Sequence, residues 1–251
     1  MIGPHVKSTK DKTDRTLPKD QWLANLQAEA QHWAAWFRDA ASAANPEAAE
    51  DLAWRTTDEC DMREKETFVP YLRPSCPPGS PARTLDVGAG PLTWFPRKWF
   101  LRDFVVTPID PLAGDFDIML QQANITPQFK TIPGEAESLS QQFAADSFHL
   151  VFCRNALEQF RDPLAAISEM LKVVKPDCWV LLVQEDQRTD EQRARGPWTI
   201  EESDADLFLN LGNERVDLAM EFADVATVRT LRSWHWPWVL GGLKKEKLAL
   251  Q

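Results

Sequence analysis

The alternation of β-rich runs with longer connecting segments between residues 83 and 183 is the feature that most restricts the fold. Short runs of valine, isoleucine, leucine and phenylalanine recur there, and residues 163–174 have a helical pattern. Such alternation is typical of parallel strands, because parallel neighbours need a long crossover connection, usually a helix. The sequence therefore predicts an α/β domain with a mostly parallel sheet. The predicted strands are 83–87, 104–109, 129–132, 148–153 and 179–183.

Composition narrows the partners of the chain. Of its 251 residues, 43% are hydrophobic and 26% are charged, as in globular proteins, and the formal net charge is −10. Proteins that bind phosphate backbones usually carry a basic surplus, so we expect no nucleic-acid partner. No apolar run approaches the ~18 residues that span a bilayer, so we expect no membrane partner.

The cysteines and the N-terminus indicate a compartment. The four cysteines are far apart in the sequence and form no cluster with histidine at zinc spacing, so we predict neither a metal site nor a disulfide framework. The first residues lack the apolar core of a signal peptide. These features predict a cytoplasmic protein, and they leave its oligomeric state open.

The N-terminal region has helical patterning that differs from the strands after it. Between residues 18 and 43, apolar side chains recur at spacings of three and four, which places them on one helix face. A second helix is predicted to start at Asn45-Pro46, because asparagine caps helices and proline suits the first turn. The apolar face of the first helix comprises Trp22, Leu26, Ala30, Trp33 and Phe37.

Composition shifts divide the chain into segments. A proline-rich run cannot continue a helix or a central strand, so it marks a connector. Beyond the predicted sheet, a polar insertion precedes two β-rich runs, 225–234 and 236–243, that can pair antiparallel. The predicted organisation is a flexible tail at 1–16, a helical lid at 17–69, a connector at 70–81, and a domain at 82–251 with an insertion at about 184–215.

The end of the first predicted strand has the chemistry of a ligand cradle. Gly88 and Gly90 allow close backbone approach, and a helix expected after them would offer unpaired N–H groups. Asp110 ends the second strand, where its carboxylate can accept hydrogen bonds from ribose hydroxyls. A dinucleotide fingerprint would have a third glycine where this chain has Thr93, so NAD is disfavoured. These residues predict a nucleoside-bearing ligand.

Further short motifs follow in a fixed order along the same region. They are GEAE at 134–137, DSF at 146–148, RNALE at 154–158, DP at 162–163 and LKVVKP at 171–176. With the glycine turn and Asp110, this series resembles the class I S-adenosylmethionine-dependent methyltransferases over roughly 100 residues, from Thr84 to Val183.

The resemblance implies a fold, a cofactor and its binding residues. The fold would be Rossmann-like, with a seven-stranded, mostly parallel sheet and an antiparallel last strand, preceded here by the helical lid. The cofactor would be S-adenosyl-L-methionine and the product S-adenosyl-L-homocysteine. Asp86 would hold the amino end of the methionine part, Asp110 the ribose, and Glu135 or Ala136 the adenine edge. The cofactor-binding residues implied are Asp86, Gly88, Ala89, Gly90, Asp110, Pro111, Glu135, Ala136, Arg154 and Asn155.

Methyl transfer from a sulfonium is an in-line displacement that depends on alignment and water exclusion rather than on an enzyme nucleophile. A hydroxyl or ammonium acceptor must still lose a proton, and we predict Glu158 and His235 as candidate bases. Gln159 stands where the family frequently has histidine, which removes one side chain able to move a proton.

The eleven tryptophans allow two interpretations. They can form core packing, the simpler account for the alternating Trp234, Trp236 and Trp238, or they can wall an acceptor pocket. For the second interpretation, the predicted acceptor-binding residues are Trp33, Trp36, Glu185, Trp198, Trp234 and Trp236.

The predicted function is methyl transfer from S-adenosylmethionine to an oxygen or nitrogen of a small organic molecule, for example a natural-product intermediate. One alternative is a protein that binds the cofactor without turnover, which the missing histidine favours. A second is a nicotinamide-dependent oxidoreductase, supported only by the strand, glycine and acidic-residue arrangement that dinucleotide sites share.

Overall fold

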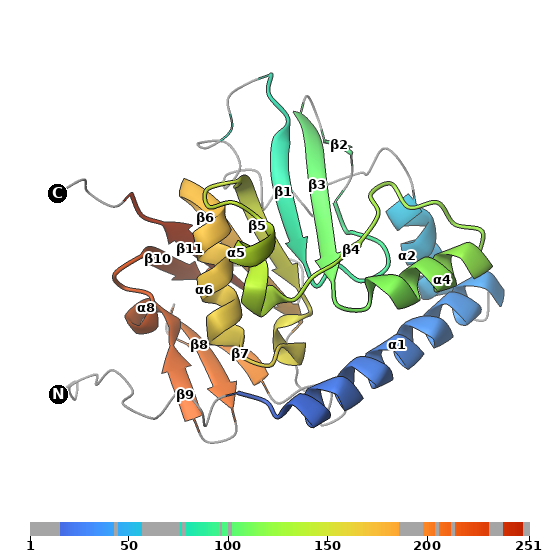
Figure 1. Ribbon diagram of the computed structural model, residues 1–251, viewed down its shortest axis with the longest axis horizontal. Coiled ribbons are helices and arrows are strands. Elements are labelled where there is room, and N and C mark those ends of the chain that lie inside the picture. The colour runs from blue at the N-terminus through green and yellow to red at the C-terminus, as the bar shows by residue number, and fades with distance from the viewer. Residues whose placement is uncertain are drawn as a thin grey trace.

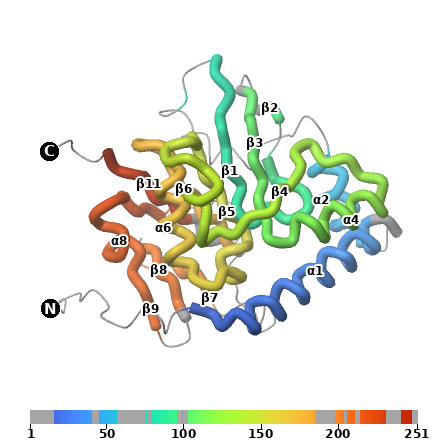
Figure 2. Tube along the Cα trace, in the orientation of Figure 1, coloured from blue at the N-terminus to red at the C-terminus, as the bar shows by residue number. Residues whose placement is uncertain are grey.

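A computed structural model describes residues 16–42, 45–56, 76, 79–95, 97–99, 102–185, 198–203, 206–211, 214–230 and 238–247. Its centre is a twisted sheet with helices packed against it, and two N-terminal helices lie at one edge of that sheet (Figures 1 and 2). Most of the predicted tail and connector lies outside the described residues.

The main sheet has the order β10-β11-β6-β5-β1-β3-β2, and β4 also pairs with β3. Strands β1, β3, β4, β5 and β6 run parallel, whereas β11 is antiparallel to both β6 and β10. The predicted α/β fold with an antiparallel last strand is confirmed, and the two-residue β2 is an additional strand antiparallel to β3. The strands are β1 (Ala82–Val87), β2 (Lys98–Trp99), β3 (Arg102–Asp110), β4 (Ile132–Pro133), β5 (Phe148–Arg154), β6 (Val174–Glu185), β10 (Ala226–Thr230) and β11 (Trp238–Lys245).

The strands are apolar because both faces of the sheet are buried. In β5 every residue from Phe148 to Cys153 is buried. One face packs on α6 (Pro163–Val173), whose predicted helix is confirmed and whose Asp162 caps Ala165 N at 2.9 Å. Alternate residues, including Phe152, form a separate cluster on the other face with Trp94 and Phe95.

The order of the central strands fixes where a ligand can bind. The chain passes from β1 to β3 on one side, and later enters β5 on the other side of β1. Where neighbouring connections diverge in this way, a crevice opens at the carboxyl ends of the strands. Alongside that edge lie α4 (Ala113–Gln122), η3 (Ala136–Ser138), α5 (Leu139–Gln142) and η4 (Leu157–Gln159).

The two N-terminal helices cover this carboxyl edge. Helix α1 (Lys19–Ser42) crosses below the arrowheads of β1 and β3 in Figure 1, and α2 (Pro46–Thr56) folds back beside it. The predicted cap of α2 is confirmed, since Asn45 Oδ1 accepts from Glu47 N (3.1 Å) and Ala48 N (3.2 Å). The apolar stripe of α1 buries Trp22 and Phe37.

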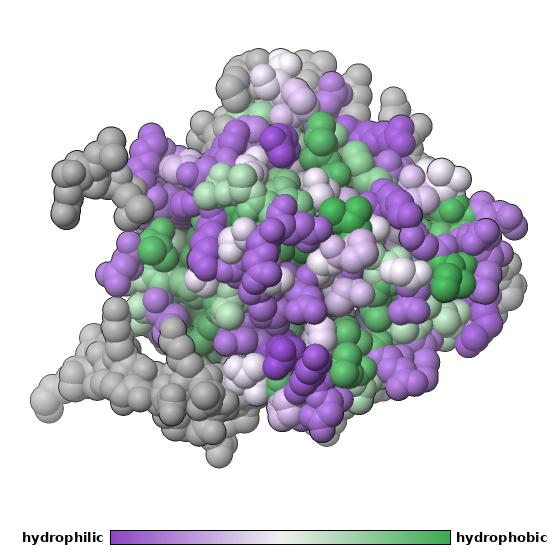
Figure 3. All heavy atoms as spheres, in the orientation of Figure 1, coloured by the Kyte–Doolittle hydropathy of each residue, from purple (hydrophilic) through white to green (hydrophobic). Residues whose placement is uncertain are grey.

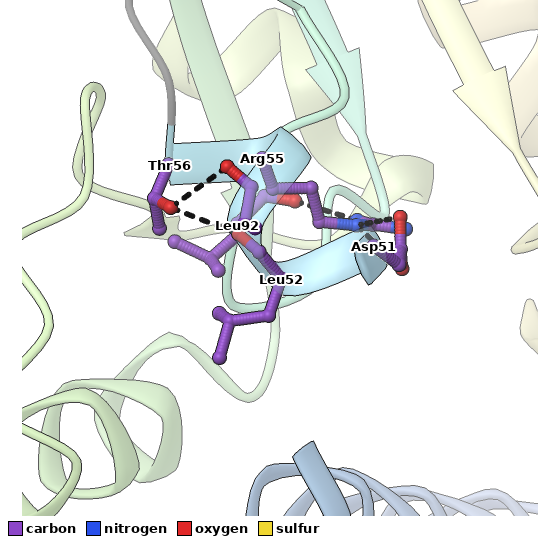
Figure 4. Close-up of polar contacts among 6 residues, drawn as sticks. Asp51, Leu52, Arg55, Thr56 and Leu92 are labelled. Atoms are coloured by element: carbon purple, nitrogen blue, oxygen red, sulfur yellow. Dashed lines mark hydrogen bonds and ion pairs between the residues drawn. The ribbon is translucent and has the colours of Figure 1, made fainter. Parts of the chain in front are cut away.

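Arg55 ties α2 to the loop after β1. Its Nε donates to both carboxylate oxygens of Asp51, at 3.0 and 2.9 Å, and its Nη1 donates to the carbonyl oxygen of Leu92 at 2.8 Å. Figure 4 shows the side chain lying between these partners. Because Leu92 belongs to the loop that follows the glycine turn, α2 is held against the site-forming edge of the sheet.

The prediction of a helix directly after Gly90 is wrong for the described residues 91–95 and 97–99. This segment contains only bends before it enters β2. Trp94 and Phe95 of this segment instead pack with Phe152 on one face of the sheet.

The predicted insertion contains a small antiparallel sheet of its own. Its strands are β7 (Trp198–Ser203), β8 (Asp206–Leu211) and β9 (Glu214–Asp217), followed by the short helix α8 (Leu218–Glu221). Buried residues of this sheet, among them Ile200, Leu207 and Leu209, join the same core as α6. The insertion is therefore an extension of the main core, and the predicted 225–243 hairpin is confirmed as β10 and β11.

The surface is mainly hydrophilic on the face shown in Figure 3, with hydrophobic residues in small scattered groups. Large exposed apolar side chains such as Leu23 and Ile118 lie on α1 and α4. Among the helices of the described part of the chain, none combines the length and apolar character needed to cross a membrane.

Trp198 tests the packing of the insertion on the core. Its side chain is 1% exposed, and no described residue accepts a hydrogen bond from its Nε1. We expect Trp198→Ala to lower the free energy of unfolding by about 3–5 kcal/mol, and Trp198→Phe to cost clearly less, because phenylalanine keeps most of the volume. Chemical denaturation measures both, with Ile118→Ala as the exposed control. Equal stability of Trp198→Ala and wild type would contradict the packing.

Candidate functional site

A cavity of about 590 Å³ lies between the carboxyl edge of the sheet and helix α1. Its floor comes from the ends of β1, β3, β5 and β6 and from the segments that follow them. Its roof comes from α1, with Arg55 of α2 at one side. This volume is within the range of pockets that bind small ligands and cofactors.

The glycine turn at the end of β1 is fixed by its contacts. Gly88 has φ +68°, and a Cβ placed on it would lie 2.3 Å from the Cβ of Ala156. Gly90 has φ +66°, and a Cβ there would lie 3.0 Å from the Trp33 ring of α1. Both positions therefore require glycine by conformation and by close approach.

Asp110 joins the ends of β1 and β3. Its Oδ2 accepts from Gly90 N at 3.1 Å and its Oδ1 from Leu112 N at 2.9 Å. Burial raises the pKa of Asp110 to about 6, opposed by these two hydrogen bonds and assisted by the charges of Glu29 and Asp86. Each oxygen uses one lone pair on the backbone, so the carboxylate retains capacity for further donors in the cavity.

Asp86 is the second buried carboxyl of the floor. Thr93 Oγ1 donates to its Oδ2 at 2.6 Å. Burial raises the pKa of Asp86 to about 6, while the Thr93 hydrogen bond and the positive charges of Arg55 and Arg154 act in the opposite direction. Burial thus raises the pKa of both carboxyls to about 6, well above the ordinary value of an aspartate.

The structure brings together the residues that the sequence assigned to the cofactor. All ten line the cavity: Asp86, Gly88, Ala89, Gly90, Asp110, Pro111, Glu135, Ala136, Arg154 and Asn155. They come from four separate loops, which meet because parallel strands end at one edge of the sheet.

The predicted catalytic and acceptor residues are distributed differently. Glu158, on η4, is buried and lines the cavity. Trp33 of α1 also lines the cavity. Trp36 packs instead beside Phe37 and Leu92, and Trp198 lies in the main core away from the cavity wall. Glu185 ends β6, next to the cavity residue Gln184. Trp234, His235 and Trp236 lie outside the described residues.

Sequence reasoning missed several residues of the cavity wall. Glu29 and His32 from α1, Arg55 from α2, Trp94, and Gln184 at the end of β6 all line it. The apolar pattern of α1 predicted that one face of the helix is buried, but it did not predict the surface on which that face packs. Gln184 carried the only positional signal, because it follows a predicted strand at the ligand-binding edge.

The first half of α1 and the residue Leu17 before it are tied to the segment after β5. Leu17 N donates to the Arg161 carbonyl oxygen at 2.8 Å, and Gln159 Nε2 donates to Glu29 Oε2 at 3.0 Å. The Arg161 guanidinium lies 5.9 Å from the centre of the Trp22 ring. These contacts hold α1 against the segment after β5, beside the cavity.

The charges of the cavity are unbalanced. Two guanidinium groups, Arg55 and Arg154, stand against six carboxyl groups, which favours a ligand that carries positive charge. Among the described residues, no three His, Cys, Asp or Glu side chains are placed to hold a metal ion, and the buried Cys76, Cys153 and Cys178 form no disulfide with one another. The six carboxyl groups are Glu29, Asp86, Asp110, Glu135, Glu137 and Glu158.

Asp86→Asn tests the buried carboxyl of β1. The asparagine keeps an acceptor for Thr93 but does not ionise. Because the folded pKa lies above the ordinary 3.8, wild type loses stability as pH rises from about 4 to about 6 and beyond until the folded group is fully ionised. We expect the difference in free energy of unfolding, Asp86→Asn minus wild type, to increase by about 2 kcal/mol between pH 4.5 and pH 7. Denaturant unfolding at several pH values measures it. A difference that does not vary with pH would contradict the assignment.

Comparison with known proteins identifies the central region. Residues 85–182 match the family model described as a methyltransferase domain. No curated protein matches the chain.

Solved structures resemble the chain at low identity. The PH0226 protein of Pyrococcus horikoshii OT3 is 16% identical, over 75% of this chain and 93% of that protein, with a TM-score of 0.45. A SAM-dependent methyltransferase from Methanosarcina mazei is 18% identical, over 66% and 94%, with a TM-score of 0.39. The CurJ carbon methyltransferase is 16% identical, over 68% and 50%, with a TM-score of 0.43. Residues 85–182 of the chain are thus similar to a methyltransferase domain.

Proposed function

We propose that the protein transfers a methyl group from S-adenosylmethionine to an oxygen or nitrogen of a small organic molecule. The observation that supports this most directly is the convergence of Asp86, the Gly88–Gly90 turn and Asp110 on one roofed cavity. Small-molecule acceptors fit this proposal because α1 closes over the cavity and leaves room of ligand size, about 590 Å³ in total.

The donor set of the cavity suits this cofactor. A ribose offers two hydroxyl donors, and Asp110 presents a buried carboxylate with acceptor capacity left. The amino group and the sulfonium of the cofactor are cationic, and the carboxyl surplus of the cavity would stabilise them. Asp86 would face the methionine end, and Glu135 with Ala136 the adenine end.

The chain would contribute mainly positioning and water exclusion. Bound S-adenosylmethionine supplies an electrophilic methyl group on a sulfonium. Helix α1 would exclude water from the cavity, and the glycine turn would hold the methionine part against the edge of β1. Glu158, buried at the cavity wall, is the described side chain proposed to accept a proton from the acceptor.

Labelled methyl transfer tests the proposal as a whole. We expect the protein to bind S-adenosylhomocysteine in calorimetry and to move labelled methyl from S-adenosylmethionine to compounds in a fractionated extract of its source cells. Binding without any transfer would identify a non-catalytic cofactor-binding protein. Displacement of S-adenosylhomocysteine by NAD(H) at similar concentration would favour the oxidoreductase alternative.

Asp110→Ala tests the ribose contact. The change removes a charge-assisted acceptor, so we expect S-adenosylhomocysteine to bind at least about tenfold more weakly, equivalent to about 1.4 kcal/mol. Isothermal titration calorimetry measures the affinity, and circular dichroism checks the fold. Asp115→Ala, on the exposed side of α4, is the matched control. Unchanged affinity in Asp110→Ala would refute the contact.

Trp33→Ala tests the roof. The Trp33 ring contacts the Gly90 position and meets Phe116 edge to face at 6.2 Å. Its loss should loosen α1 over the cavity, so we expect kcat to fall about tenfold or more through water entry and poorer alignment. Leu23→Ala, exposed on the same helix, should keep wild-type kcat. If both variants turn over at the wild-type rate, α1 has no role in transfer.

A further inference from the structure

Helix α1 presents a line of polar side chains to the cavity. Asn25, Glu29 and His32 all line it from the roof, and their spacing of four and three residues places them on one face of the helix. A helix that only packed on the sheet would turn apolar residues inward and leave its polar residues in solvent. The polar line therefore indicates that α1 contacts a ligand as well as the sheet.

Glu29 is positioned by contacts on two sides of the cavity. Its Oε2 accepts a hydrogen bond from Gln159 Nε2 of η4 at 3.0 Å. One helical turn further along α1, about 6 Å by the helix rise, the Trp33 ring lies against the Gly90 position. Gly90 N in turn donates to Asp110 Oδ2 at 3.1 Å. Glu29 therefore lies over the cavity between η4 and the glycine turn.

The carboxyl of Glu29 lies near enough to that of Asp110 for their charges to interact. Burial is the main cause of the raised pKa of Asp110, and the negative charge of Glu29 adds to the rise. Charge–charge energies fall with distance, so this effect agrees with the contacts that place Glu29 near the glycine turn. Two carboxyls that face one cavity from its floor and its roof favour a ligand whose hydrogen-bond donors lie between them.

The second oxygen of Glu29 has capacity for such a donor. Gln159 uses Oε2, and within the described part of the chain Oε1 accepts no hydrogen bond. A ribose has two neighbouring hydroxyl groups, each with one O–H donor. Asp110 can accept one of them from the floor of the cavity, and Glu29 can accept the other from the roof.

We infer that Glu29 is a cofactor-binding residue, whose Oε1 accepts a hydrogen bond from one ribose hydroxyl of S-adenosylmethionine while Asp110 accepts from the other. This inference rests on the proposed function and deepens it, because it adds a residue of the roof to the cofactor site. Sequence reasoning assigned every cofactor contact to the edge of the sheet and none to α1. Glu29 ties α1 to the floor through the ribose, so cofactor binding and closure of the roof are coupled.

Ligands that lack one hydroxyl test the contact. The full-length protein is titrated by calorimetry with S-adenosylhomocysteine and with its 2′-deoxy and 3′-deoxy analogues. The three ligands differ only in the ribose, so the comparison isolates the hydroxyl contacts. We expect wild type to bind each analogue about tenfold more weakly than S-adenosylhomocysteine, because each analogue loses one hydrogen bond to a carboxylate.

Variants assign each preference to its residue. Glu29→Leu should bind S-adenosylhomocysteine about tenfold more weakly and should no longer distinguish it from one of the two analogues. Asp110→Ala should lose the preference over the other analogue. Gln159→Leu removes the partner of Glu29 but not its carboxylate, so it should keep both preferences. Glu50→Leu, exposed on α2, is the matched control and should bind all three ligands as wild type does.

Hydrogen–deuterium exchange of wild type gives a second readout that needs no variant. At saturation, S-adenosylhomocysteine should protect the backbone amides of α1 more than at least one of the two analogues does, because that analogue lacks the hydroxyl bound by Glu29. Equal protection of α1 by all three ligands would overturn the inference, even if Glu29→Leu fails to fold.

The calorimetric outcomes separate this inference from the proposed function. If wild type does not bind S-adenosylhomocysteine, the proposed function fails. If wild type binds it but binds both analogues equally well, cofactor binding is retained and this inference is overturned. If Glu29→Leu weakens all three ligands by the same factor, or weakens none, Glu29 only ties α1 to η4, and the inference is again overturned.

Discussion

The carboxylate of Asp110 is the interaction on which the site geometry depends. By accepting from Gly90 N and Leu112 N, it joins the glycine turn after β1 to the start of α4 after β3. Its burial has a cost, which is visible in a pKa of about 6 for Asp110. A residue selected only for stability would avoid that cost, so a buried carboxyl that both organises two loops and faces the cavity is typical of a functional site.

Much of this arrangement follows from local sequence. The strand ends were predictable because apolar runs stop where polar and glycine residues begin, and parallel strands end at one edge. That geometry alone gathers Asp86, Gly90, Asp110 and Arg154 from segments up to 68 residues apart in the chain. The cap at Asn45 was equally predictable, since it depends on atoms within three residues.

Other parts depend on contacts between distant segments, which no local pattern contains. In place of a helix after Gly90, the chain covers the sheet with Trp94 and Phe95. The position of Arg55 depends on the Leu92 carbonyl oxygen, 37 residues further along. Gln184 gave a weak signal at a strand end, but its burial at the cavity wall becomes apparent only when the surrounding core is known.

The tryptophans of α1 show why packing and pocket formation were not true alternatives. Trp33 is part of the helix's inward stripe, yet its ring both touches the Gly90 position and lines the cavity. A cavity at a sheet edge has to be closed by the same apolar face that anchors the covering helix. Opening the roof must therefore break the contact between Trp33 and the glycine turn, so the turn that would hold the cofactor and the helix that would exclude water are coupled by direct packing.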